Sequence, residues 1–224
     1  MSGFWQQALT ITRRDLTIEG RAGEVVGVVL PFAAIAVFVV PLATDALESR
    51  LTQLGFPIFW LVALLFGMQI SLRQTGTETA NQRRQLALLG LDPAARFIGR
   101  SLAASALTLL VLVVSLPLVV VFYNPPSMRD PWVIAPVIVL FAAGLSMLTT
   151  MAGDVTAGLR TRSVLAPLLV APLAVPLMIG ASQTVEALVH DRTILTWILL
   201  LVVVDLGLLI TGFLASRPLE DAAI

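Results

Sequence analysis

The chain of 224 residues contains no cysteine, no lysine and a single histidine, His190. Without cysteine it forms no disulfide and offers no thiolate ligand to zinc or to an iron–sulfur cluster. Without lysine it has neither a P-loop lysine for nucleotide phosphates nor a Schiff-base nucleophile. One histidine cannot form a two-histidine zinc motif, and no second ligand accompanies it as a haem or metal ligand. These absences predict a chain that is not itself an enzyme.

Charged residues are also scarce, at 12% of the chain against 58% hydrophobic residues. A soluble domain carries about 25% charged residues. The formal net charge is zero, which argues against a nucleic-acid partner. The composition therefore favours a membrane protein, with the lipid bilayer as its first partner.

Six apolar runs of roughly 20 residues are present, the length that crosses a hydrocarbon core of about 30 Å. Lipid cannot hydrogen-bond a bare backbone, so each run is predicted to be a transmembrane helix. The fold class predicted is an all-α membrane protein of six transmembrane helices, with residues 1–224 forming one domain. The predicted helices cover residues 25–44, 56–72, 102–122, 132–152, 163–182 and 194–215.

The segments between these runs alternate in arginine content. Eleven of the fourteen arginines lie before the first run, after the second, after the fourth and after the sixth. The positive-inside rule places these segments, and both termini, in the cytoplasm. The localisation predicted is the bacterial cytoplasmic (inner) membrane.

Residues 1–24 are predicted to form an amphipathic helix in the plane of the membrane interface. Trp5 belongs to an apolar half of its circumference, and Arg13 and Arg14 lie on the other half. Asp15 interrupts the apolar face, so we expect it to contact protein rather than lipid. Two interpretations remain open: a simple membrane anchor, or an elbow helix that transmits motion from a cytoplasmic partner through these four residues.

The longest polar segment covers residues 73–101. Its middle has a helix-forming composition that ends at Gly90, and Asp92-Pro93 supplies a cap and a first-turn proline for a helix that enters the third run. A short helix between two spans can dock into a groove of a partner protein, whereas the alternative is a solvated loop. The candidate ATPase-coupling residues are Glu78, Arg83, Arg84, Leu86 and Leu89.

Three prolines, Pro167, Pro172 and Pro176, interrupt the fifth run. Each removes a backbone donor and crowds the preceding turn, so this helix is expected to be kinked or broken. The break indicates either a gating helix beside the transport path or ordinary kinked packing. Residues 183–191, which follow it, are predicted to form a short helix against the outer leaflet.

Asp205 is the one ionisable residue inside the six runs. An aspartate near the midplane costs roughly 2.5–3.5 kcal/mol on insertion scales, so it is expected to face the interior of the bundle. Two roles remain open: a proton or substrate site on the pathway, or a hydrogen bond to Ser146, Thr149 or Thr150 on the fourth run.

Three stretches carry a family resemblance: FWLVALLFGMQISLR (59–73), LALLGLDPAARFIGRSL (86–102) and VLAPLLVAPLAVPLMIGA (164–181). Together with the RRDL motif of the first helix, they resemble the CcmB-type haem exporter permeases of cytochrome c maturation, which are ABC-2-type transporter permeases. The fifth run, with its prolines, is the most specific of the three. The chain departs from the acidic-Gly-x-Leu-Glu pattern that members often show before the leucine cluster, because only Glu78 is acidic there.

The resemblance implies an ABC-2-type permease that forms a homodimer on a separate ATPase subunit, with the segment 78–89 resting in a groove of that ATPase. It further implies haem export or delivery to a periplasmic haem chaperone, beside a haem-handling membrane subunit. On this interpretation the chain binds no cofactor, since haem is the substrate and ATP is bound by the partner. Two other functions remain open: a permease that exports a lipid or a drug, and a membrane scaffold that transports nothing.

Overall fold

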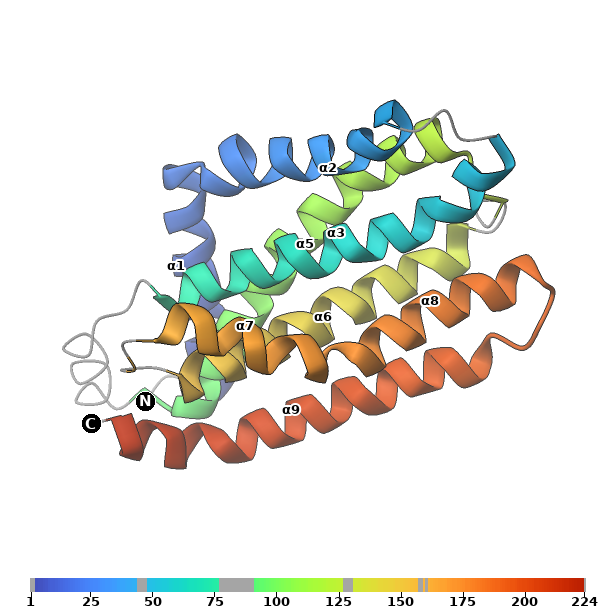
Figure 1. Ribbon diagram of the computed structural model, residues 1–224. Helices are drawn as coiled ribbons and strands as arrows, with labels where there is room; N and C mark the ends of the chain where they lie inside the picture. Colours follow the sequence, from blue (N-terminus) through green and yellow to red (C-terminus); the bar gives the residue numbers. More distant parts are fainter. Residues whose placement is uncertain are drawn as a thin grey trace.

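The computed structural model describes residues 3–43, 48–76, 91–126, 131–156, 159 and 161–223, and every regular element in these ranges is a helix (Figure 1). In chain order the elements are α1 (Phe4–Ala22), the π-helix η1 (Val25–Val29), α2 (Leu30–Ala43), α3 (Glu48–Gly76), α5 (Pro93–Tyr123), α6 (Pro131–Val155), α7 (Arg162–Leu173), α8 (Val175–Val189) and α9 (Leu195–Ala223).

Within the described residues, five helical stretches are long and apolar enough to cross a membrane. The pair α7 and α8, which meet at a bend of 45°, makes a sixth span if the two are counted together. Figure 1 shows the spans lying side by side in one bundle, with the N-terminus and the C-terminus at the same end. The prediction of an all-α membrane protein is confirmed.

Helix α5 lies at the centre and packs against α1, α2, α3, α6 and α9. Trp60 of α3 lies against Phe141 of α6 and against its own neighbour Phe59, with ring centroids 5.0 Å apart in both pairs. A Cβ atom added at Gly67 would lie 2.8 Å from Cδ2 of Leu145, so the absence of a side chain here lets α3 approach α6 closely. Apolar burial drives little association in lipid, and tight packing of this kind is what holds such helices together.

The helices extend beyond the apolar runs. Helix α5 begins at Pro93, and the Asp92 side chain caps it by accepting a hydrogen bond from the Ala94 backbone N–H at 3.0 Å. This confirms the helix start predicted at Asp92-Pro93. The first turns of α5 therefore lie within the segment 73–101, and residues 77–90 lie outside the described part of the chain.

The prediction of a separate short helix over residues 183–191 is wrong, because α8 continues without a break to Val189. This part of α8 packs as the rest does, with Thr184 and Ala187 buried. Helix α8 also lies close to α9, where a Cβ atom at Gly180 would stand 2.8 Å from Cγ of Leu201. Packing against α9 keeps the chain helical up to the turn at His190.

Candidate functional site

The first helix is docked on the start of α5. A Cβ atom at Gly99 would lie 2.6 Å from the Ala8 carbonyl oxygen, so the two backbones touch at this glycine. The Thr12 hydroxyl donates to the Gly99 carbonyl at 2.9 Å, and Oε1 of Gln7 accepts from the Asp92 backbone N–H at 3.0 Å. Contacts at Gly99 and at Asp92 therefore fix α1 to the helix that follows the predicted coupling segment.

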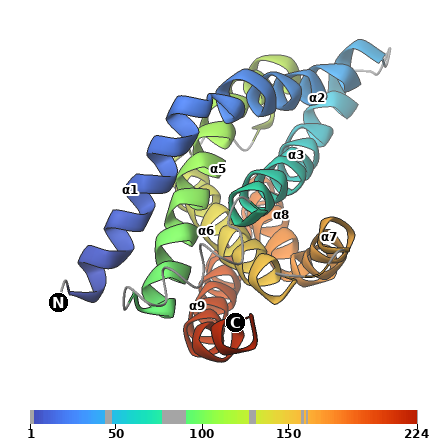
Figure 2. The same cartoon turned by 90° about the vertical axis from the view of Figure 1, so that its left-hand side faces the viewer.

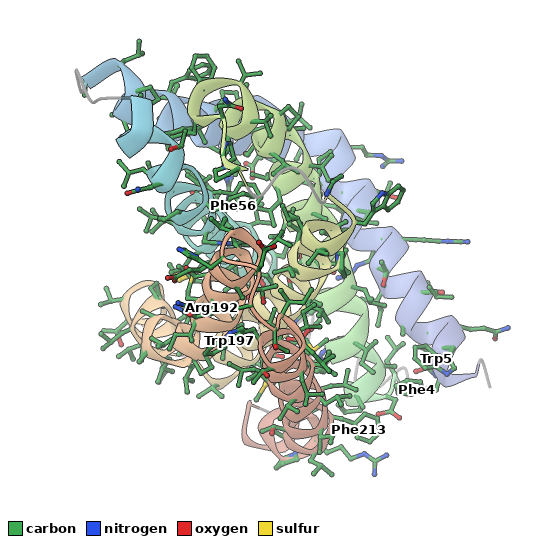
Figure 3. The ribbon with its side chains drawn as sticks, turned by 90° about the vertical axis from the view of Figure 1, so that its right-hand side faces the viewer. Phe4, Trp5, Phe56, Arg192, Trp197 and Phe213 are labelled. Carbon is green, nitrogen blue, oxygen red and sulfur yellow. The ribbon has the colours of Figure 1, made fainter. Side chains whose placement is uncertain are left out.

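The contact with α5 divides the apolar face of α1. Ala8 and Ile11 are buried against protein, whereas Trp5 is 65% exposed and Leu9 50% exposed. Phe4 lies against Phe213 of α9, with ring centroids 6.1 Å apart (Figure 3). One part of the apolar face thus holds the helix to the bundle and the other is free for lipid.

The polar elbow residues lie on different sides of α1. Asp15 is buried and forms an ion pair with Arg14, with Nε and Oδ1 separated by 3.1 Å. Arg13 is exposed. Asp15 is therefore turned away from lipid, as the sequence led us to expect.

Helix α1 meets the first span at a corner (Figure 2), and polar contacts stabilise this corner. Gly23 caps the C-terminal end of α1, and its φ of 65° is a left-handed conformation suited to glycine. Beyond it, Oε1 of Glu19 accepts a hydrogen bond from the Val25 backbone N–H at 2.6 Å. Glu24 forms an ion pair with Arg73 at the end of α3. Beneath this corner lies a cavity of about 400 Å³ between α1, η1 and α3.

A second cavity, of about 440 Å³, lies at the opposite end of the bundle. Gln53, Phe56, Glu186 and His190 are among its lining residues. Nδ1 of His190 lies 2.9 Å from the Glu186 carbonyl oxygen. Across the described ranges, no three histidine, cysteine or acidic side chains are grouped so that they could hold a metal ion.

A buried ion pair joins α5 to α6 near the arginine-rich end. Nη1 of Arg100 lies 3.3 Å from Oδ1 of Asp154, and the two side chains are 2% and 15% exposed. The sequence predicted a helix that starts at Asp92-Pro93 and includes Arg100, but it did not point to Asp154 as the partner of this arginine. The spacing of Arg96, Gly99 and Arg100 after the helix cap was the available signal, since residues three and four apart share one helix face.

Asp205 faces the interior of the bundle, as predicted, and is 7% exposed. Within the described residues neither carboxylate oxygen has a hydrogen-bond partner. The proposed hydrogen bond to the fourth run is wrong: the Thr150 hydroxyl donates to the Ser146 carbonyl at 2.7 Å, and the Thr149 hydroxyl lies 2.5 Å from Oγ of Ser71. A short intrahelical bond competes with any partner on a neighbouring helix.

Asp205 instead packs against α6 at a glycine. A methyl group at Gly144 would overlap both Oδ1 of Asp205 and a methyl group of Leu177, so α6, α8 and α9 meet here without space to spare. The absence of a side chain at Gly144 is what admits the carboxylate to the interior.

The sequence matches the model of a protein family over residues 6–220, from the first turn of α1 almost to the end of α9. That family is described as the CcmB protein. The chain belongs to the CcmB family. Two curated relatives are similar to it, both called "Heme exporter protein B". The one from Paracoccus denitrificans is 31% identical over 77% of this chain and 79% of its own length. The one from Rhodobacter capsulatus is 30% identical over the same shares.

Membership of the CcmB family confirms the resemblance found in the three sequence stretches. Combined with the helices described above, it makes this chain a multi-pass membrane protein of the permease type.

The broken span lies within this CcmB match. Helix α7 contains Pro167 and Pro172, and Pro176 opens α8 immediately after the junction at Ala174. The break predicted from the prolines is confirmed, and its role in gating stays a prediction. The candidate coupling residues Glu78, Arg83, Arg84, Leu86 and Leu89 lie outside the described residues, so their role also stays a prediction.

Proposed function

We propose that this chain is the permease subunit of an ABC-type complex that exports or delivers haem for cytochrome c biogenesis. The observation that carries the proposal is the CcmB match over residues 6–220, together with two relatives named heme exporter protein B at about 30% identity. The chain supplies the membrane path or its support, and a separate ATPase subunit binds and hydrolyses ATP.

The arrangement at the arginine-rich end suits such coupling. The segment 77–90 joins α3 to α5, and α5 packs against α1, η1, α2, α3, α6 and α9. A force applied to the segment would reach α1 through the Thr12–Gly99 hydrogen bond and α6 through the Arg100–Asp154 ion pair. ATP binding shifts the permease between conformations only if the ATPase binds them with unequal affinity. The rigid joints around α5 would convert that difference into movement of the spans.

Several finer features belong to the same proposal. Both termini are cytoplasmic, because the arginine-rich segments lie at the end of the bundle where the termini lie. Two copies of the chain assemble on the ATPase, and a haem-handling membrane subunit and a periplasmic haem chaperone work beside them. The chain itself holds no cofactor, and haem is its substrate.

The test is genetic complementation with a biochemical readout. A strain that lacks its own CcmB gene is supplied with this chain and, where required, with the ATPase encoded beside it. The measurement is covalently bound haem in c-type cytochromes on a denaturing gel. Restoration of cytochromes together with co-purification of an ATPase is expected. Charge reversal at Arg83 and Arg84 is expected to abolish both, while reversal at Arg192 in the opposite loop leaves both intact.

Other outcomes separate the alternatives. Co-purification of an ATPase without restored cytochromes would indicate a permease for another substrate, such as a lipid or a drug. Restored cytochromes without an ATPase would indicate a scaffold. If a stably inserted protein neither restores cytochromes nor co-purifies with an ATPase, the proposal is refuted.

A further inference from the structure

The cavity of about 400 Å³ beneath the corner of α1 has the form of an amphipathic binding site. Its volume lies within the range of about 300–1,000 Å³ that is usual for small-molecule sites. Its lining combines charged side chains with apolar ones, among them Val25, Val29 and Ile70. It is independent of the broken span and of Asp205.

Both signs of charge are present around this cavity. The cations are Arg14 and Arg73, and the anions are Asp15, Glu19 and Glu24. Two cations against three anions leave the lining with a formal surplus of one negative charge. Such a lining disfavours a purely anionic ligand and suits a zwitterion with an ammonium group beside the carboxylates and a phosphate beside the arginines.

The depth of the cavity in the membrane points to a lipid. The first span begins at Val25, and the second apolar run ends at residue 72, directly before Arg73. The charged part of the cavity therefore lies at headgroup level, and the apolar part extends into the bilayer. The π-helix η1 turns Val25 and Val29 inward, where they are 4% and 1% exposed, while Val26 remains 62% exposed to lipid. Wide turns of this kind are frequent at functional sites.

We propose that this corner binds a phospholipid with a primary ammonium headgroup, of the phosphatidylethanolamine type, as a resident ligand. The ammonium donates to the carboxylates of Glu19 and Glu24, the phosphate accepts from Arg14 and Arg73, and an acyl chain follows the apolar wall along η1. The lipid would join α1, the first span and α3, three elements that also meet here through the Glu19–Val25 hydrogen bond and the Glu24–Arg73 ion pair.

The experiment is native mass spectrometry of the purified full-length protein after exchange through nanodiscs of stated lipid composition. The arms contain phosphatidylethanolamine, phosphatidylcholine or phosphatidylglycerol. Phosphatidylethanolamine is expected to be retained preferentially, because phosphatidylcholine has no ammonium N–H donor and phosphatidylglycerol carries only the anion. A fourth arm adds free phosphoethanolamine, which is expected to displace little lipid, because it lacks the acyl chains.

Matched variants locate the site. Glu19→Gln keeps a carbonyl oxygen for the Val25 backbone N–H and removes the charge, and it is expected to weaken phosphatidylethanolamine retention roughly tenfold. Arg73→Gln is expected to do the same through the phosphate. The control is Glu186→Gln, which neutralises a glutamate in the cavity at the opposite end and should leave retention unchanged.

Four outcomes would overturn the proposal. Equal retention of phosphatidylglycerol would show that the site does not select the zwitterionic headgroup. Full competition by free phosphoethanolamine would show that the ligand need not be a lipid. Unchanged retention in a folded Glu19→Gln variant would show that the lipid does not bind in this cavity. A cavity that keeps no lipid but becomes protected from solvent when the ATPase subunit is added would assign this corner to protein docking. A variant that does not fold leaves the lipid selectivity of the wild-type protein as the deciding measurement. None of these results depends on whether haem is the substrate.

Discussion

The ion pair between Arg100 and Asp154 allows a quantitative test of how α5 is held to α6. The perturbation is a double-mutant cycle of Arg100→Leu, Asp154→Leu and the two together. Each single change leaves one charge near the membrane boundary without this partner, with the remaining Arg100 side chain 2% exposed or the remaining Asp154 side chain 15% exposed. The double change replaces both charges with apolar groups.

The expected magnitude follows from this burial. Removal of one member of a buried ion pair costs about 3–5 kcal/mol, and the partial exposure of Asp154 favours the lower end. A loss of about 3 kcal/mol lowers the unfolding midpoint of a chain of this size by about 6–12 °C. The double variant should lose about 2 kcal/mol less than the sum of the single variants, because apolar replacement of both members is often nearly neutral.

The assay is thermal unfolding of the purified protein in one detergent, followed by intrinsic fluorescence. The internal control is Arg217, whose Nη2 lies 4.0 Å from Oδ2 of Asp92 with the arginine side chain 74% exposed. Arg217→Gln should shift the midpoint by less than about 2 °C, because exposed ion pairs contribute little. Additive losses at Arg100 and Asp154, or an equal shift at Arg217, would refute the reasoning that this pair is a buried joint.

Three further results are expected. Gly99→Ala places a methyl group 2.6 Å from the Ala8 carbonyl oxygen and should destabilise the protein by about 1–3 kcal/mol. It should also detach α1, which a spin-label distance between α1 and α5 would measure in this cysteine-free chain. The control Gly27→Ala has open space around it and should change neither the stability nor this distance. Asp92→Ala removes the cap of α5 and should cost about 1 kcal/mol in unfolding free energy, whereas Asp92→Asn should recover most of it. Asp205→Asn breaks no hydrogen bond seen in the described residues, so it should leave the unfolding midpoint unchanged or raise it. If the charge takes part in transport, the variant will lower the amount of covalent haem in c-type cytochromes. An unchanged amount of haem would exclude that role.

Much of the fold could be predicted because the bilayer imposes local rules. An apolar run of about 20 residues must be helical, whatever its neighbours are. The cap at Asp92 and the prolines around Ala174 act within one or two turns, so the start of α5 and the break between α7 and α8 were also readable. The short helix assigned to residues 183–191 failed because polar composition alone does not end a helix that packs against α9.

The candidate site was less predictable because its contacts join distant residues. Arg100 and Asp154 are 54 positions apart, and Thr12 reaches the Gly99 carbonyl across 87 positions. The Thr149 and Thr150 hydroxyls, two of those proposed for Asp205, had nearer partners in their own helix or in α3. A sequence shows which polar groups are present. Which of them pair with one another depends on the distances between them once the helices are packed.

The sequence by itself determined that this chain crosses a membrane, that a helix starts at Asp92-Pro93, which segments are arginine-rich and where the fifth span breaks. Only the tertiary structure decided which face of each span is buried. In a soluble protein the apolar face of a helix is the face that packs in the core. In a bilayer the lipid-facing and core-facing sides of a helix are both apolar, so the periodicity of apolar residues does not distinguish them. Gly67, Gly99 and Gly144 mark the buried faces of their helices because they allow a neighbouring helix to come close. Whether a glycine has this effect depends on which helix packs against it.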